Sequence, residues 1–291
     1  MSTSHSGPSA ASGAGSGDGA ATRFVTVDGI RLRVRIEGTG QPLLLVMGIG
    51  GNIEMWAPLI GALEGRQTIA FDAPGTGESS LPKRPLRIKD LARIAGRLLD
   101  QLDYGQVDVL GVSFGGAIAQ QLAFQEPERV RKLILAATAC GLGGVPGNPL
   151  TMAILLTPFR YYSRTYLELV APYLYGRGGG DDDGLTQQQR LARLHRPPNM
   201  LGYYFQMAAM AGWTSLPFLR RISQPTLVMA GTDDRILPPV NGRMLARLIP
   251  GARLYIVEGG GHLFLLDRAP ESAEAIQGFL GQAPVPEGDG P

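Results

Sequence analysis

The stretch that decides the fold runs Val107-Asp-Val-Leu-Gly-Val-Ser-Phe-Gly-Gly-Ala-Ile-Ala-Gln-Gln-Leu-Ala123. It begins as an apolar run rich in β-branched residues, which indicates a buried strand, and it ends as a run of helix formers. Between the two lies Gly111-Val-Ser-Phe-Gly115, a match to G-x-S-x-G. A sharp strand-to-helix turn holds its central residue in a strained backbone with the side chain exposed at the strand end. Ser113 is therefore a candidate nucleophile.

The composition limits the class of protein. The chain has 291 residues, of which 44% are hydrophobic, so it can form one large α/β domain with a substantial core. Only 18% are charged and the net charge is +2, which gives no reason to expect a nucleic-acid partner. The single cysteine, Cys140, excludes an internal disulfide. No run of 18 apolar residues occurs, so no transmembrane segment is expected.

The pattern along the chain predicts a core domain with an insertion. Residues 1–22 are mostly Ser, Gly and Ala, which predicts a disordered tail and not a signal peptide, and residues 282–291 predict a second loose end. Strand patterns alternate with helical ones over 23–140 and again over 218–281, which predicts a mostly parallel sheet with helices on both faces. Residues 141–217 lack a strand pattern and are rich in Met, Tyr, Phe and Leu. They predict a helical cap over the strand ends.

Eight strands are expected in this sheet, the fifth of them starting at Val107. The other seven are expected at 23–27, 31–36, 43–47, 67–71, 132–137, 226–230 and 252–257. Asp28-Gly29 predicts a hairpin turn between the first two strands. Helices are expected at 53–63, 88–102, directly after Ser113, and at 152–156, 161–174, 200–211, 240–249 and 271–280, with an acidic loop at 178–184.

The base that a catalytic serine needs is sought among three histidines, because a hydroxyl is a poor nucleophile until a base takes its proton. His5 lies in the N-terminal tail, and His195 is interpreted as a solvated helix end within the cap. His262 follows the last strand in a glycine-rich loop. Parallel strands end on one side of a sheet, so this loop is expected at the same edge as Ser113. Position and elimination together predict His262 as the base.

The acid that orients the base is expected after a strand between these two residues. The loop after the strand at 226–230 offers Asp233 and Asp234, one of which reaches the histidine while the other caps the loop. The residues alone leave this choice open. Asp72 precedes Ser113 in the chain and is predicted to hold its own loop through backbone N–H groups.

Backbone N–H groups are the expected stabilisers of the oxyanion that forms in acyl transfer. One donor is Phe114, the residue after the candidate nucleophile, and the second is Ile49, in the glycine-rich loop after the strand at 43–47. No Cys, His or carboxylate cluster has the spacing of metal ligands, so no metal is expected. The glycine loops match no dinucleotide or P-loop pattern, so no cofactor is expected either.

Several further stretches give the chain a family resemblance. The chain resembles the α/β-hydrolase superfamily along 23–281, and most of all the intracellular medium-chain-length polyhydroxyalkanoate depolymerases. The stretches that carry the second resemblance are 47–54, 71–79, 102–107, 135–139, 202–206, 212–215, 224–228 and 261–265. By these motifs the resemblance places the nucleophile on Ser113, the acid on Asp234 and the base on His262. Those depolymerases carry Trp after the nucleophile, whereas this chain has Phe114.

The resemblance implies a serine esterase that hydrolyses poly(3-hydroxyalkanoate) with medium-length side chains. It also implies a cytoplasmic location, with the surface of a polymer granule as a partner. The cap side chains Tyr203, Met210 and Trp213 are then expected to line the substrate cleft, since ligand pockets are mostly apolar. A small-molecule carboxylesterase, lactonase, C–C hydrolase or perhydrolase on the same triad is the alternative. A non-catalytic ligand receptor is the alternative from another class, and the intact Ser, Asp and His count against it.

Overall fold

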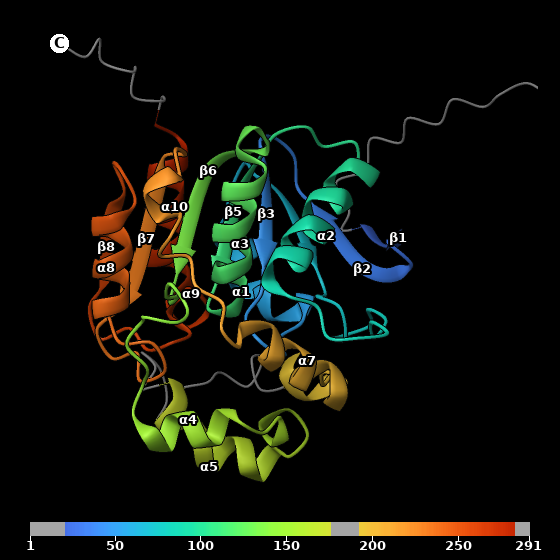
Figure 1. The fold of residues 1–291 in the computed structure, drawn as a ribbon, viewed down its shortest axis with the longest axis vertical. Helices are drawn as coiled ribbons and strands as arrows, with labels where there is room; N and C mark the ends of the chain where they lie inside the picture. The colour runs from blue at the N-terminus through green and yellow to red at the C-terminus, as the bar shows by residue number, and fades with distance from the viewer. Residues whose placement is uncertain (1–20, 176–191, 283–291) are drawn as a thin grey trace, which may run out of the picture.

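One eight-stranded sheet organises residues 21–175 and 192–282, which are the residues that the computed structural model describes (Figure 1). The strands are β1 Ala21–Val27, β2 Ile30–Glu37, β3 Pro42–Val46, β4 Gln67–Phe71, β5 Val107–Val112, β6 Val130–Ala136, β7 Thr226–Gly231 and β8 Arg253–Val257. Their order is β1-β2-β4-β3-β5-β6-β7-β8. Strand β2 pairs antiparallel with β1 and β4, and all other pairs are parallel. The predicted mostly parallel sheet of eight strands is confirmed.

Strands β1 and β2 form the hairpin that Asp28-Gly29 predicts. Both turn residues have positive φ, 50° and 77°, which a two-residue turn of this kind requires and which Asp and Gly tolerate. The pairing of the two strands extends to Ala21, opposite Ile36. Strand β1 therefore begins two residues earlier than expected and takes the last two residues of the predicted tail, because backbone pairing with β2 continues that far.

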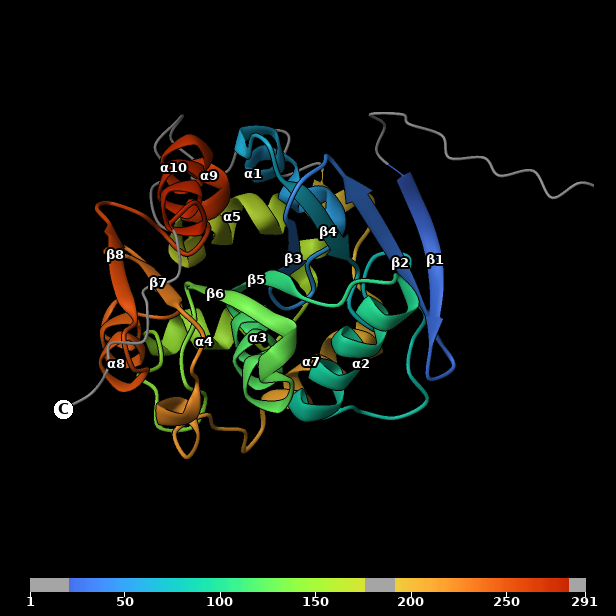
Figure 2. The ribbon, with the colours of Figure 1, turned by 90° about the horizontal axis from the view of Figure 1, so that it is seen from above.

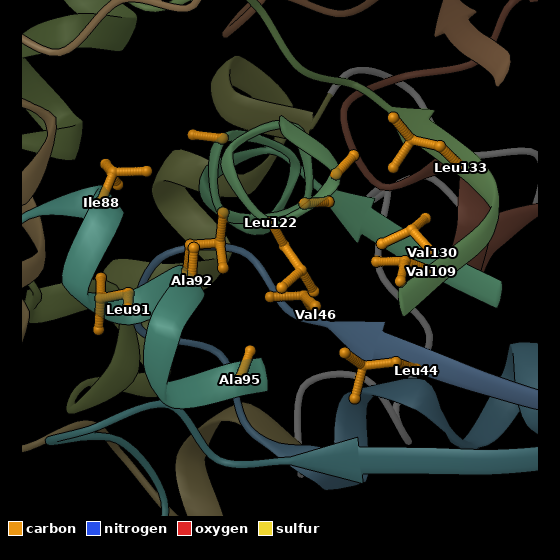
Figure 3. Packing of buried hydrophobic residues seen from close by; sticks show 14 of the residues in the cluster. Leu44, Val46, Ile88, Leu91, Ala92, Ala95, Val109, Leu122, Val130 and Leu133 are labelled. Atoms are coloured by element: carbon orange, nitrogen blue, oxygen red, sulfur yellow. The ribbon is translucent and has the colours of Figure 1, made fainter. Parts of the chain in front are cut away.

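The two faces of the sheet carry separate apolar clusters, each covered by helices. Helices α2 Ile88–Gln101, α3 Phe114–Gln125 and α8 Val240–Leu248 cover one face, and α1 Ala57–Ala62, α9 Phe264–Asp267 and α10 Ala269–Leu280 cover the other (Figure 2). Successive side chains of a strand point to opposite faces. In β3, Leu44 and Val46 accordingly pack with α2 and α3 (Figure 3), whereas Leu43 and Leu45 pack on the α1 and α10 side.

The helices expected in the cap lie beyond the carboxyl ends of the parallel strands (Figure 1). They are α4 Pro149–Leu155, α5 Arg164–Tyr175 and α7 Met200–Met210, with a 3-10 turn at Phe159–Tyr161. One anchor to the core is Trp213, whose indole N–H donates to Gln121 Oε1 at 2.9 Å. The cap therefore covers the edge of the sheet where Ser113 lies.

Three features predicted from the sequence fall outside the described residues. They are residues 1–20 of the N-terminal tail, which include His5, the acidic loop at 178–184, and residues 283–291. Within the described ranges, none of the helices has both the length and the apolar character that crossing a bilayer requires.

Candidate active site

Ser113 occupies the sharp turn between β5 and α3. Its backbone has φ 54° and ψ −118°, a conformation that is strained for any residue other than glycine. Hydrogen bonds hold the turn on both sides. The Ser113 N–H donates to the Ala136 carbonyl at 3.0 Å, and the Thr138 hydroxyl donates to the Ser113 carbonyl at 2.8 Å. The structure thus gives Ser113 the geometry of a nucleophile elbow.

The two glycines of G-x-S-x-G are required by the close approach of β5 to α3. A Cβ atom on Gly111 would collide with the carbonyl oxygen of Gly115, and one on Gly115 would collide with the carbonyl oxygen of Val46 in β3. Backbone atoms cannot give way as a flexible side chain can. The two glycines of the motif are therefore explained by the close packing of the backbone around Ser113.

His262 and Asp234 form a buried hydrogen-bonded pair. His262 Nδ1 lies 2.8 Å from Asp234 Oδ2, and the two residues are 6% and 5% exposed. The other oxygen, Oδ1, accepts from the N–H groups of Ile236 and Leu237 at 2.9 and 2.8 Å. A carboxylate only accepts, so Nδ1 carries the proton in this pair and Nε2 is left as the acceptor. This is the tautomer that can take a proton from a serine.

Asp233 takes no part in this pair. Its side chain is exposed, and among the described residues its one hydrogen bond is accepted from the Thr232 hydroxyl at 3.4 Å. The sequence suggested that one aspartate reaches the histidine while its neighbour caps the loop. In the structure Asp234 does both, with one oxygen toward His262 and the other toward the loop N–H groups.

Ser113 and His262 line one cavity under the cap. Its wall is mostly apolar and also contains Met47, Gly48, Ile49, Gly51, Met55, Val112, Leu155, Arg160, Tyr161, Tyr175, Arg193, Ile236 and Leu263. The structure therefore brings the candidate nucleophile and base to one space. Residues from the core domain and from the cap share its wall.

The expected oxyanion donors lie beside this cavity. Phe114 is the first residue of α3, so its N–H has no partner within the helix. Ile49 lies in the cavity wall. The peptide unit that follows it is held by the cap at both ends: the Tyr161 hydroxyl donates to the Ile49 carbonyl at 2.6 Å, and the Gly50 N–H donates to Gln206 Oε1 at 2.8 Å. The cap thus fixes the loop that carries Ile49.

The three cap residues expected to line the cleft do not line this cavity. Tyr203 is fully buried; its hydroxyl donates to the Leu155 carbonyl at 2.6 Å and accepts from Arg160 Nη2 at 2.9 Å. Met210 and Trp213 pack against the cluster on the α2 and α3 side of the sheet. Their apolar character reflects the anchoring of the cap to the core. Composition gives the burial of a side chain but not the direction in which it points.

Two residues of the cavity wall were missed by the sequence analysis. Arg160 and Arg193 are each 2% exposed. The only sequence signal near Arg193 was the stretch around His195, and the structure places His195 on the surface, in agreement with its interpretation as a solvated helix end. Buried arginines give no pattern in a sequence, because arginine is ordinarily an exposed residue.

Asp72 holds its own loop, as predicted. Its carboxylate is fully buried and accepts from the N–H groups of Ile53 and Glu78 at 2.8 and 2.9 Å. Burial raises the pKa of Asp72 to about 6, although the two N–H groups and Arg33 act in the opposite direction. Asp72 therefore ties the loop after β4 to the segment that precedes α1, away from the His262 pair.

With this geometry in place, similarity to known proteins identifies the class. Residues 41–269 match the family described as alpha/beta hydrolase fold, and the chain belongs to that family. A poly(3-hydroxyalkanoate) depolymerase from Ectopseudomonas oleovorans is 48% identical over 242 residues, which cover 83% of this chain and 84% of that protein. A 2-hydroxymuconate semialdehyde hydrolase from Pseudomonas sp. strain CF600 is 30% identical over 279 residues, 90% of this chain and 94% of that protein.

Solved structures agree with this assignment. A hydrolase from Pseudomonas aeruginosa has a TM-score of 0.75 at 28% identity and covers 90% of this chain and 98% of its own. An enol-lactonase from Burkholderia xenovorans has a TM-score of 0.72 at 26% identity, and the match covers 89% of this chain and 100% of that chain. The predicted α/β-hydrolase fold and the resemblance to polyhydroxyalkanoate depolymerases are thereby confirmed. Together, the family and the relative at 48% identity support a carboxylic ester hydrolase.

Proposed function

We propose that the protein is a serine hydrolase that cleaves the ester bonds of poly(3-hydroxyalkanoate) with medium-length side chains. The observation that carries the chemistry is the buried His262–Asp234 pair beside a cavity that Ser113 enters from a strained turn. This arrangement supports Ser113 as nucleophile, His262 as base and Asp234 as the acid that orients it. The polymer substrate is supported by the relative at 48% identity, which is named as a depolymerase of this polymer class.

The proposed reaction proceeds in two acyl transfers. Ser113 Oγ attacks the ester carbonyl carbon while His262 Nε2 takes the hydroxyl proton, and the carbonyl π electrons move to the oxygen. The N–H groups of Phe114 and Ile49 stabilise this oxyanion, each donor contributing roughly 3 kcal/mol. The bond between the former carbonyl carbon and the oxygen of the leaving alcohol then breaks, and this alkoxide takes the proton from His262. Water, deprotonated by His262, then attacks the acyl carbon; the bond from that carbon to Ser113 Oγ breaks, and His262 returns the proton to Oγ, which releases the acid and the free serine.

The surface of the cap supports a polymeric, apolar substrate. Of the sixteen large hydrophobic side chains exposed among the described residues, twelve lie between residues 141 and 217. They are Leu142, Val145, Leu150, Leu156, Phe159, Tyr162, Leu169, Tyr173, Met200, Leu201, Tyr204 and Leu216. Apolar surface gathered on one part of a protein is typical of an interaction site. We propose that this surface contacts polymer granules in the cytoplasm.

Probe labelling, ester kinetics and polymer hydrolysis test the proposal. The wild type should react with a fluorophosphonate probe, whereas Ser113→Ala should remain unlabelled and lose at least about 10³-fold in kcat on p-nitrophenyl octanoate. Octanoate should be preferred over acetate by at least about tenfold, because each buried methylene contributes up to about 0.8 kcal/mol. Granules of poly(3-hydroxyoctanoate) should release 3-hydroxyacids faster than granules of poly(3-hydroxybutyrate).

Two outcomes would contradict the proposal at different levels. Labelling of Ser113→Ala by the probe would show that another residue is the nucleophile. A preference for acetate or a small lactone, with no release of 3-hydroxyacids from either polymer, would leave the serine hydrolase in place. That result would replace the polymer with a small-molecule ester.

A further inference from the structure

Two buried arginines from the cap lie in the wall of the cavity that contains Ser113 and His262. Arg160 belongs to the 3-10 turn at Phe159–Tyr161, and Arg193 to a helical stretch that precedes α7. Each is 2% exposed. Arginine remains charged at all physiological pH values, and a charge removed from water is ordinarily paired with an opposite one. The partners of these two side chains are therefore informative.

The partners in the described residues are all neutral. Arg160 Nη1 donates to the Thr157 carbonyl at 2.9 Å and Nη2 to the Tyr203 hydroxyl at 2.9 Å, while Arg193 Nη1 donates to the Tyr175 hydroxyl at 2.7 Å. The Nε atoms of both arginines are buried without a hydrogen-bond acceptor. No carboxylate among the described residues forms an ion pair with either. Two guanidinium groups thus share one cavity wall and have only neutral partners among the described residues.

Another buried arginine of the same protein is surrounded by carboxylates. Arg33 is 4% exposed, and the carboxylates of Glu54, Asp72 and Glu78 lie within ion-pair distance of its guanidinium group. Buried Lys132, by contrast, has the carbonyl oxygens of Phe279, Leu280 and Gln282 as its hydrogen-bond partners, so a buried cation in this fold is held either by carboxylates or by neutral acceptors. Arg160 and Arg193 have no carboxylate partner among the described residues, and they line the cavity that contains Ser113 and His262.

The two arginines also face one ring. The guanidinium carbon of Arg160 lies 4.7 Å from the centroid of the Tyr161 ring, and that of Arg193 lies 5.7 Å from the same centroid. Tyr161 itself lines the cavity. Contacts with aromatic faces stabilise a cation only weakly and do not replace a counter-charge. The arrangement fits an anion that enters the cavity from outside.

We propose that Arg160 and Arg193 bind a carboxylate carried by the substrate while its ester group lies at Ser113. The inference rests on the proposed function. Guanidinium groups form strong, directional hydrogen bonds with carboxylates. At the acid end of a 3-hydroxyalkanoate chain, two carbons separate the free carboxylate from the oxygen of the last ester linkage. A site that holds both groups cuts that linkage and releases one 3-hydroxyacid at a time from the carboxyl end.

The test compares two small esters that differ in this charge and in one methyl group. They are the dimer of 3-hydroxyoctanoic acid with its carboxylate free and the same dimer as its methyl ester. We expect wild-type kcat/KM to favour the free acid by at least about tenfold, the scale of one charge-assisted hydrogen bond. Arg160→Gln and Arg193→Gln should each bring this ratio toward one. Because the ratio is taken within each variant, a loss of folded protein does not affect it.

A matched control is available on the surface of the same cap. Arg164 in α5 pairs with Glu168 at 2.8 Å and has a side chain that is 73% exposed. Arg164→Gln removes a cap arginine outside the cavity, so it should keep the wild-type ratio. A wild-type ratio near one, or equal losses of the ratio in Arg164→Gln and Arg160→Gln, would overturn the proposal.

A binding measurement separates this inference from the proposed function. In the Ser113→Ala variant, calorimetry should show 3-hydroxyoctanoate bound at least about tenfold more tightly than its methyl ester, and addition of Arg160→Gln should remove the difference. Such binding, combined with a wild type that cleaves no ester, would uphold the anion site and refute the esterase. Ester cleavage by the wild type, with no difference in binding between the acid and its methyl ester, would uphold the esterase and refute the anion site.

One internal explanation is tested by the same substrates. Asp181, Asp182 and Asp183 lie outside the described residues and could supply a counter-charge from the chain itself. If they do, the wild-type ratio of free acid to methyl ester should be near one and should rise when all three are changed to Asn. That outcome would overturn the assignment of the arginines to a substrate carboxylate.

Discussion

Substitution of Asp234 by Asn separates the orientation of His262 from the stability of the loop. In the structure, Asp234 Oδ1 accepts from the N–H groups of Ile236 and Leu237, and Oδ2 faces His262 Nδ1 at 2.8 Å. The amide oxygen of Asn can keep both loop hydrogen bonds. Its NH₂ group then replaces the oxygen that faces His262, so an acceptor becomes a donor while the shape of the side chain is conserved.

The size of the effect follows from this exchange. An amide N–H directed at Nδ1 forces the imidazole proton onto Nε2, which then cannot accept the Ser113 proton, and the imidazolium formed in the reaction loses its counter-charge. The same change in a serine protease triad lowers kcat about 10⁴-fold, and we expect a loss of that order here. Because the loop hydrogen bonds remain, the free energy of unfolding should change by less than about 1 kcal/mol.

The assay is kcat for p-nitrophenyl octanoate together with urea unfolding, and Asp233→Asn is the matched control. Asp233 is exposed and hydrogen bonds only weakly with Thr232, so its substitution should change kcat by less than about threefold. The reasoning would be refuted if Asp233→Asn lowered kcat more than Asp234→Asn. It would also be refuted if the loss in Asp234→Asn followed a loss of folded protein.

Three further predictions concern the packing and the polar contacts around the site. Gly115→Ala should lower the free energy of unfolding by about 1–3 kcal/mol and abolish fluorophosphonate labelling, because the added methyl group collides with the Val46 carbonyl. Normal labelling of this variant would contradict the prediction. Burial raises the pKa of Asp72 to about 6, so the stability that its protonation provides is complete below about pH 4 and lost as the pH rises through about 6. Between these pH values the free energy of unfolding of the wild type, measured in urea, should fall by roughly 2–3 kcal/mol relative to that of Asp72→Asn. Parallel plots of unfolding free energy against pH for the two proteins would refute this. Tyr161→Phe removes the hydroxyl that holds the Ile49 carbonyl, so kcat should fall about tenfold with little change in KM, whereas a rise in KM alone would indicate a binding role.

The parts of the molecule that the sequence predicts well are those with a local cause. Continuous apolar runs such as Leu43 to Val46 mark buried strands, because successive side chains must enter two separate clusters on opposite faces of the sheet. The elbow at Ser113 is visible because glycine is required where β5 approaches α3. His262 could be placed because parallel strands end at one edge of a sheet.

The parts that could not be predicted depend on directions and on distant contacts. Asp233 and Asp234 are neighbours with the same chemistry, and only the folded loop decides which one points inward. Tyr203 and Trp213 have the composition of a substrate wall, yet their polar ends meet Leu155 and Gln121 elsewhere in the fold. Contacts of this kind join residues 48 and 92 positions apart, and no local pattern reports them.

Tyr161 contacts both the loop that carries Ile49 and the two cap arginines. Through this side chain the cap takes part in the chemistry as well as in binding. Its hydroxyl holds the carbonyl of Ile49, whose N–H is an expected oxyanion donor, and its ring faces both Arg160 and Arg193. An anion bound by the two guanidinium groups would therefore contact the same side chain that positions the oxyanion loop. A substrate that fills the arginine site should then raise kcat as well as lower KM, because binding energy gained in the cap stabilises the geometry that the transition state requires.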